Sequence, residues 1–184
     1  MKPVFLIGYM GCGKTTLGEA LAVVAGLPFI DMDERIERSC GKSIPEIFDE
    51  MGEKGFRTLE SETLREMTAM TDVIVGCGGG TACNDDNMAL MNRAGITVWL
   101  TTSPERITAR LLLPDQKIKR PKILHLPDGE VLPFVRQELQ AREPNYRQAQ
   151  LHFDSTDIET AAATRRTARR LAAVLESFQT GGSH

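Results

Sequence analysis

The sequence predicts an α/β fold in three layers, with a central five-stranded parallel sheet between two layers of helices. Short, uninterrupted apolar runs of strand length alternate with longer stretches of helical periodicity along the chain. This alternation is typical of strands that are buried on both faces of a parallel sheet. At 184 residues, 41% of them hydrophobic, the chain is also long enough to bury one core as a single domain.

The first elements are expected in the order strand, loop, helix, strand. "VFLIG" (residues 4–8) is an apolar run that ends in glycine, and "TLGEALAVVAG" (16–26) carries apolar residues at helical spacing before a terminal glycine. "LPFIDMD" (27–33) follows as the second strand. Ser43 and Glu46 then form a capping box for a short helix that Gly52 closes, before a longer helix over 53–70.

The rest of the chain continues the alternation up to a C-terminal tail. We expect strands at 72–76, 96–101 and 151–155, and helices beginning at 103, over 134–142 and over 158–178. Three prolines and a glycine interrupt residues 113–131, a segment that we expect to be a mobile lid. The single domain is expected to span 1–178, with a disordered tail at 179–184.

Composition excludes several classes of protein. The net charge is −3, with 22 Lys+Arg against 25 Asp+Glu, so the chain as a whole is not expected to bind nucleic acid. The opening "MKPVFLIGYMGCGK" has too short an apolar run for a signal peptide or a membrane span. The four cysteines have no C-x-x-C spacing, which favours a reducing compartment, and we expect a cytoplasmic protein.

A phosphate-binding loop is the most specific motif in the sequence. Gly8, Gly13, Lys14 and Thr15 satisfy G-x-x-x-x-G-K-[ST] between an expected strand and an expected helix. The glycines allow backbone N–H groups to face phosphate oxygens, Lys14 would reach the β and γ phosphates, and the Thr15 hydroxyl would bind Mg²⁺. The expected ATP-binding residues of the loop are Gly11, Cys12, Gly13, Lys14, Thr15 and Thr16.

Two carboxylates follow the second strand. Asp31 and Asp33 stand two residues apart, so on a strand both would point to the same face. In open α/β sheets, ligands bind at the carboxyl ends of the strands. One carboxylate could therefore hold Mg²⁺, while the other takes the proton of a substrate hydroxyl. The alternative is that Asp33 only caps the helix that begins "ERIE".

Other candidate residues are two arginines, a run of glycines and a cationic stretch in the lid. Arg57 has Glu60 as an obvious helical partner, and Arg142 precedes Pro144.

Three consecutive glycines after a buried strand predict a wall to which a ligand comes close. Gly78, Gly79 and Gly80 form this run, and the lid cations are Lys117, Lys119 and Arg120. Each set also has a plainer interpretation, as solvated charges or as a turn. The later "RRTARR" is interpreted as the exposed face of the last helix.

Taken in order, these motifs resemble the shikimate kinase family, within the nucleoside monophosphate kinase-like P-loop enzymes. The likeness covers about the first 147 residues: the phosphate loop, "DMD", "FR..E", "GGG", "RP" in the lid and "R.PNY". It implies Mg²⁺-dependent transfer of the ATP γ-phosphoryl group to the 3-hydroxyl of shikimate, a step in aromatic amino-acid biosynthesis, by a monomer.

The resemblance also implies a role for individual residues. Asp33 would hold the shikimate hydroxyls and accept the proton, and Arg57 and Arg142 would grip the carboxylate. Lys14 and Arg120 would contact the phosphates as catalytic groups. The remaining implied roles are Thr15 and Asp31 for the metal, Gly80 as a backbone donor, Phe48 and Phe56 as an apolar wall, and Glu60 as the residue that orients Arg57.

Three alternatives stay open on the residues alone. The nearest is a kinase with another acceptor, such as gluconate or a nucleotide. A GTPase-like switch is a second, because "DEMG" (49–52) fits D-x-x-G, although no N-K-x-D guanine motif occurs. The third is a nucleotide-binding module without catalytic activity.

Overall fold

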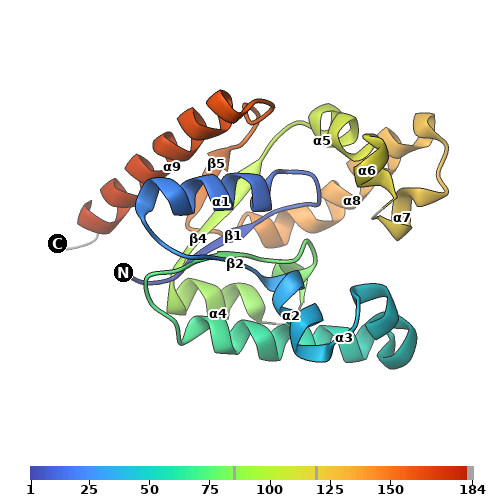
Figure 1. Cartoon of the computed structure of the whole chain (residues 1–184), viewed down its shortest axis with the longest axis horizontal. Helices are drawn as coiled ribbons and strands as arrows, with labels where there is room; N and C mark the ends of the chain where they lie inside the picture. The colour runs from blue at the N-terminus through green and yellow to red at the C-terminus, as the bar shows by residue number, and fades with distance from the viewer. Residues whose placement is uncertain (85, 119, 182–184) are drawn as a thin grey trace.

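The computed structural model describes residues 1–84, 86–118 and 120–181, and it confirms the three-layer α/β prediction (Figure 1). Five parallel strands are arranged in the order β2-β3-β1-β4-β5. They are β1 (Val4–Ile7), β2 (Phe29–Asp31), β3 (Ile74–Gly76), β4 (Ile96–Thr101) and β5 (Leu151–Asp154). β1 is central, with Val4 in register with both Ile74 of β3 and Ile96 of β4.

The two faces of the sheet carry separate hydrophobic clusters because successive side chains of a strand point to opposite sides. Val4 and Leu6 pack with α1 (Lys14–Ala25) and α9 (Ala161–Gly181). Phe5 and Ile7 pack on the other side. The helices that contribute to that second cluster are α2 (Met32–Cys40), α3 (Ile44–Thr68), α4 (Asn87–Ala94), α5 (Pro104–Leu111), α7 (Pro121–Leu124) and α8 (Asp128–Tyr146).

Local signals explain several helix ends. Gly26 ends α1 in the left-handed conformation at φ 67°, as its position predicted. The capping box at the start of α3 is confirmed, because the Glu46 carboxylate accepts from the Ser43 backbone N–H at 2.7 Å. The break expected at Gly52 is confirmed, because its backbone angles are not helical and two helical stretches of α3 meet there. Gly52 forms a kink within α3, with φ 68°.

Several element boundaries differ from the prediction. Residues 179–181 continue α9, while the rest of the expected tail, 182–184, lies outside the described residues. α8 does not end at Arg142 but runs through Pro144 to Tyr146. In addition, α9 begins at Ala161 rather than at residue 158, and α4 carried no sequence prediction.

The segment expected to form a lid, residues 113–131, is helical over most of its described residues rather than irregular. It contains α6 (Pro114–Lys117), α7 (Pro121–Leu124) and the start of α8. Pro114 and Pro121 each occupy the first helical position, where a proline is favoured because its missing N–H would have no partner there. The prolines therefore begin short helices instead of preventing them. In the part of the chain that the structure describes, no helix is both long and apolar enough to span a bilayer.

Candidate active site

The phosphate-binding loop connects β1 to α1 and has the backbone that its glycines predicted. Gly8, Gly11 and Gly13 all have positive φ, at 141°, 78° and 97°. Such angles strain other residues, and they curl the chain so that α1 begins beneath the loop. The Lys14 ammonium lies inside this curl and donates to the carbonyl oxygens of Gly8, at 2.8 Å, and Tyr9, at 3.0 Å.

The outer side of the loop is held by residues from far along the chain. Arg110 Nη1 donates to Gly11 O at 3.1 Å, and its Nη2 donates to the carbonyl oxygens of Ser155 and Thr156. The Ser155 hydroxyl donates to Cys12 O at 2.7 Å. Arg110 thus ties the loop to the segment after β5.

Cys12, predicted to bind ATP, has a structural position in the loop. Its thiol is buried in the core, and its N–H donates to Tyr9 O at 3.2 Å. Cys12 therefore shapes the loop.

Thr15 and Asp31 come together at the candidate metal site. The Thr15 hydroxyl donates to Asp31 Oδ2 at 2.9 Å, while Asp31 Oδ1 caps α2 by accepting from the Asp33 N–H at 3.0 Å. These oxygen donors fit Mg²⁺, which takes few protein ligands and completes its shell with water and phosphate oxygens. Within the described residues no cluster of three or more His, Cys, Asp or Glu is placed to hold a metal. A metal here would therefore need the nucleotide's own oxygens.

Asp33 lies on α2, in its first turn, and not on the strand. The expectation that Asp31 and Asp33 share one strand face is wrong, because β2 ends at Asp31, which itself caps the helix. Burial, helped by the neighbouring charges of Asp31 and Glu60, raises the pKa of Asp33 to about 6, against opposing contributions from Lys14 and Arg120. A half-buried carboxylate with this pKa is suited to accept a proton near neutral pH.

Arg57 is held by the glutamate that the sequence predicted. Its Nη1 donates to Glu60 Oε2 at 2.8 Å, and Glu60 is only 1% exposed. The other Glu60 oxygen accepts from the Thr81 hydroxyl at 2.6 Å. This buried carboxylate fixes the orientation of the Arg57 guanidinium.

The three glycines leave space for the charged groups around them. A Cβ built on Gly78 would lie 2.8 Å from both Asp33 Oδ1 and Glu60 Oε1, and one on Gly80 would lie 2.5 Å from Arg57 Nη1. Such contacts are shorter than real side chains allow, so both positions need glycine because the protein's own charged side chains lie against them. Asp33 thus lies at the first glycine of the run and Arg57 at the third.

Arg142 reaches the same glycine run from α8. Its Nη1 donates to Gly79 O at 3.2 Å, and the Tyr146 hydroxyl donates to the same oxygen at 2.6 Å. Arg57 and Arg142 therefore flank consecutive residues of one loop, although they lie on different helices. Phe48 and Phe56 stack nearby on α3, with ring centroids 4.4 Å apart and Phe56 beneath Arg57.

The lid cations have different surroundings. Lys117 is paired with Asp128 at 2.6 Å and also donates to Leu126 O, so its ammonium is held within the lid. Arg120 is the N-cap residue of α7, immediately before its first helical residue, and its Nε is buried with no partner among the described residues. Lys119 lies outside the described residues. Of this predicted cluster, Arg120 is the described member left to meet a ligand.

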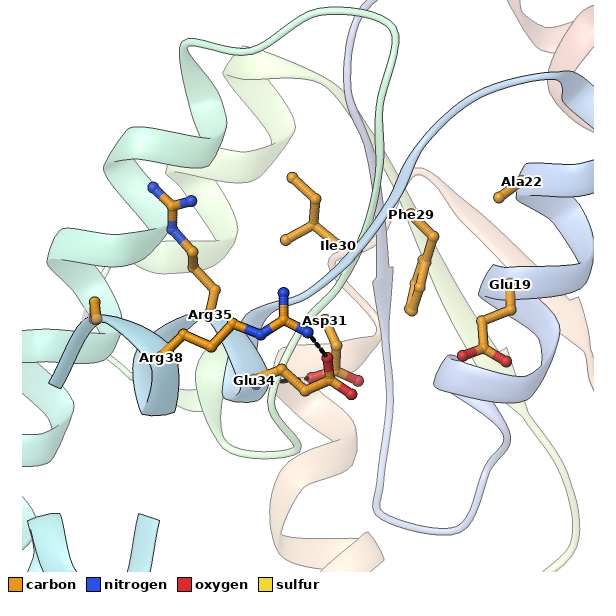
Figure 2. Close-up of a pocket in the computed structure, with 9 residues that line it drawn as sticks. Glu19, Ala22, Phe29, Ile30, Asp31, Glu34, Arg35 and Arg38 are labelled. Atoms are coloured by element: carbon orange, nitrogen blue, oxygen red, sulfur yellow. Dashed lines mark hydrogen bonds and ion pairs between the residues drawn. The ribbon is translucent and has the colours of Figure 1, made fainter. Parts of the chain in front are cut away.

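A hollow of about 700 Å³ lies outside this group, along the edge strand β2 (Figure 2). Glu19 and Ala22 of α1 stand on one side of it, and α2 lies on the other, where Arg38 pairs with Glu34 at 3.2 Å. Of the described residues that line it, Asp31 alone belongs to the predicted site. The candidate site is therefore marked by converging charged groups rather than by this hollow.

Most predicted site residues converge, and sequence reasoning missed several that support them. The predicted residues surround the loop, the start of α2 and the glycine run. The ones to which no role was given are Tyr9, Glu138, Tyr146 and Ser155. Tyr9 lies inside the phosphate-loop motif, Tyr146 ends "R.PNY", and Glu138 has i,i+4 spacing from Arg142 on an expected helix, so of the four only Ser155 had no sequence signal. The four arginines of "RRTARR" lie exposed on α9, as expected.

The fold and site together define a P-loop phosphotransferase in which two arginines, Arg57 and Arg142, lie against a glycine run beside the phosphate loop. The family model described as shikimate kinase matches residues 10–175. The chain belongs to the shikimate kinase family, and it is an ATP-dependent small-molecule kinase.

Individual relatives agree with this assignment. A shikimate kinase from Bacteroides thetaiotaomicron is 42% identical over 176 residues, which cover 96% of this chain and 99% of the relative. A crystal structure of shikimate kinase from the same organism superposes with a TM-score of 0.91 at 41% identity, covering 95% of this chain and 98% of that one. The structure of shikimate kinase from Acinetobacter baumannii in complex with shikimate has a TM-score of 0.82 at 32% identity, covering 96% of this chain and 94% of that one.

The alternatives left open by the residues fare differently. A gluconokinase from Sinorhizobium meliloti has a TM-score of 0.58 at 18% identity, covering 100% of this chain and 98% of that one, which is a likeness of fold alone. The GTPase-like switch loses its motif, because residues 49–52 lie within α3 and its kink. The family match also argues against a module without catalytic activity.

Proposed function

We propose that the protein is a shikimate kinase, which transfers the γ-phosphoryl group of ATP to the 3-hydroxyl of shikimate to form shikimate 3-phosphate in aromatic amino-acid biosynthesis. One observation carries the choice of acceptor: Asp33 at Gly78, with Arg57 and Arg142 at the two following glycines. A small acceptor with hydroxyls at one end and a carboxylate at the other would satisfy both kinds of charge.

In this proposal the acceptor lies against Gly78–Gly80. Arg57 and Arg142 bind its carboxylate, and Gly80 donates its N–H to a hydroxyl. Asp33 accepts the proton of the 3-hydroxyl as the hydroxyl oxygen attacks the γ-phosphorus and the bond to the ADP oxygen breaks. The pKa of Asp33, raised to about 6, supports this role because a much weaker base would not hold the proton.

The donor half uses the phosphate loop and the lid. Lys14 exchanges its loop carbonyl partners for phosphate oxygens, and backbone N–H groups of Gly11 and of Gly13 to Thr16 bind the rest of the triphosphate, while that of Cys12 stays bonded to Tyr9 O. Arg120 adds positive charge where negative charge develops. Thr15 and Asp31 would hold Mg²⁺, which when bound supplies neutralisation of the phosphate charge.

The acceptor is tested by measuring ADP release, with Mg²⁺ and ATP, over a panel of shikimate, gluconate and nucleoside monophosphates. We expect release with shikimate and only background release with the others, because only shikimate joins a ring of hydroxyls to a carboxylate of matching size. Release with gluconate and not with shikimate contradicts the proposal. An assay without acceptor controls for hydrolysis of ATP.

We further propose that the lid, residues 113–131, closes when both substrates are bound. The buried, unpartnered Arg120 Nε supports this, because anionic ligands supply the partner that the described residues do not. Hydrogen exchange measures it: protection of lid amides should rise with a non-hydrolysable ATP analogue plus shikimate, and little with either alone. Equal protection in all states contradicts closure.

The assembly and location are proposed as a cytoplasmic monomer. The four cysteines are unpaired, as expected in a reducing compartment. A mass of about 20 kDa by light scattering, against the 20.3 kDa of one chain, would support the monomer, and twice that mass would contradict it.

A further inference from the structure

We propose that Glu138, on α8, is a positioning residue for acceptor binding. It would hold the Arg142 guanidinium in the orientation that receives the acceptor's carboxylate. This inference rests on the proposed function, in which Arg142 binds that carboxylate. Its basis is the set of contacts that Arg142 makes and the chemistry of each contact.

Arg142 is held on three sides. Glu138 Oε2 accepts from its Nη2 at 2.6 Å, Gly79 O accepts from its Nη1 at 3.2 Å, and its central carbon lies 5.2 Å from the centre of the Tyr9 ring. The Arg142 side chain is 19% exposed and that of Glu138 is 25% exposed. Of these contacts only the one to Glu138 pairs opposite charges, so it contributes most to the orientation.

The same arrangement serves the other arginine of the site. Arg57 is held by Glu60, three residues further along α3, and Arg142 is held by Glu138, four residues earlier on α8. Each guanidinium thus has a carboxylate from its own helix on one side. The second terminal nitrogen has a weaker partner in each case: Arg57 Nη2 lies 3.6 Å from the exposed Glu53, and Arg142 Nη1 donates to Gly79 O at 3.2 Å. In this inference the acceptor's carboxylate takes the place of these weaker contacts.

Glu138 has a second partner, which is weaker. Lys122 of the lid lies 3.4 Å from Glu138 Oε2, and its side chain is 61% exposed. An exposed ammonium at this distance contributes little, because solvent screens it and the long side chain loses entropy. Arg142 is therefore the partner through which Glu138 acts.

Glu138 exerts two effects of opposite sign on an acceptor. Its charge repels the incoming carboxylate, whereas its hydrogen bond orients the guanidinium that binds it. Orientation should dominate, because a guanidinium binds a carboxylate well only in the plane of its fork. The Glu138 charge is also already neutralised by Arg142 at 2.6 Å. Removing Glu138 should therefore weaken acceptor binding.

The first test is the Glu138→Ala variant. We expect its KM for shikimate to rise about tenfold, with kcat and the KM for ATP within about twofold of wild type. Glu143→Ala is the matched control: Glu143 is also on α8 and also pairs with an arginine four residues on, Arg147, but the two are 40% and 65% exposed. The control should leave all three constants unchanged. An unchanged or lowered KM for shikimate in Glu138→Ala overturns the inference.

The second test separates positioning from a general structural effect by using the methyl ester of shikimate, which has no carboxylate charge. If Glu138 acts through Arg142 on that carboxylate, the KM for the ester should be almost the same in Glu138→Ala as in the wild-type protein. An equal rise in KM for shikimate and for its methyl ester overturns the inference. Should Glu138→Ala fold poorly, Glu138→Gln keeps the shape of the side chain and removes its charge. Its KM for shikimate should rise about two- to fivefold, again with almost no change for the ester.

Different results would overturn the positioning role of Glu138 and the proposed function. Wild-type turnover of shikimate with no selective effect of Glu138 overturns the positioning role and leaves the proposed function intact. If the wild-type protein does not phosphorylate shikimate, the proposed function fails, and this inference fails with it.

Discussion

Replacing Asp33 with asparagine is expected to lower kcat by about 10²–10⁴, the range typical for loss of a general base. Asparagine preserves the size of the side chain but cannot accept the proton of the acceptor's hydroxyl. Nucleotide binding should survive, because Lys14 and the loop that hold the phosphates are untouched. Steady-state kinetics together with ADP titration measure both effects. A variant that keeps more than a tenth of wild-type kcat would show that Asp33 is not the proton acceptor.

The same substitution should stabilise the ligand-free protein. The pKa of Asp33 is raised from 3.8 to about 6, so the folded state binds more protons than the unfolded state between these values. Stability of the wild type is therefore lost as pH rises through about 6. A shift of about two units corresponds to at most about 3 kcal/mol.

Denaturant unfolding in EDTA from pH 4 to 8 should thus show Asp33→Asn equal to wild type near pH 4 and more stable above pH 6. If the difference in unfolding free energy between Asp33→Asn and wild type does not change with pH, it does not arise from the raised pKa of Asp33. Glu34→Gln, an exposed neighbour on the same helix turn, serves as the control.

Replacing Arg57 with alanine is expected to damage both acceptor binding and stability. The KM for shikimate should rise at least about a hundredfold, because one of the two cations that bind the carboxylate is lost. Glu60, only 1% exposed, would keep the Thr81 hydroxyl as its remaining partner. Breaking a buried ion pair costs about 3–5 kcal/mol, and the 27% exposure of Arg57 places this case lower, at about 2–3 kcal/mol.

A double variant separates the two effects. Adding Glu60→Gln to Arg57→Ala removes the uncompensated buried charge, so stability should return to within about 1 kcal/mol of wild type while acceptor binding stays lost. Urea unfolding and calorimetry with shikimate measure these. Arg35→Ala, which breaks an exposed pair with Glu66 at 3.5 Å, is the control, and it should change stability and shikimate affinity only slightly. Recovery of shikimate affinity in the double variant would contradict the role of Arg57.

Several features could be predicted from neighbouring residues alone because their physics is local. The phosphate loop needs only a strand, three glycines that tolerate positive φ, and a lysine at the start of a helix. The pairing of Arg57 with Glu60 follows from helical spacing. The wall at Gly78–Gly80 follows from the cost of consecutive glycines, which only a close approach of other groups compensates.

The wrong predictions arose where a local signal has two structural outcomes. Asp31 and Asp33 were expected on one strand, but Asp31 accepts the Asp33 N–H and turns the chain into a helix at once. Pro114 and Pro121 were interpreted as breaks, although a proline equally begins a helix.

The sequence by itself determined the phosphate-binding loop, the parallel sheet, and which residue types are proposed to bind the acceptor. Only the tertiary structure decided how the two halves meet. β3 lies between β2 and β1, which brings Asp31 and Gly78 to the edge of the phosphate loop. Arg142 reaches Gly79 across 63 residues and Arg110 reaches Gly11 across 99. Such contacts depend on how whole elements pack, and no spacing within a short stretch of sequence specifies that packing.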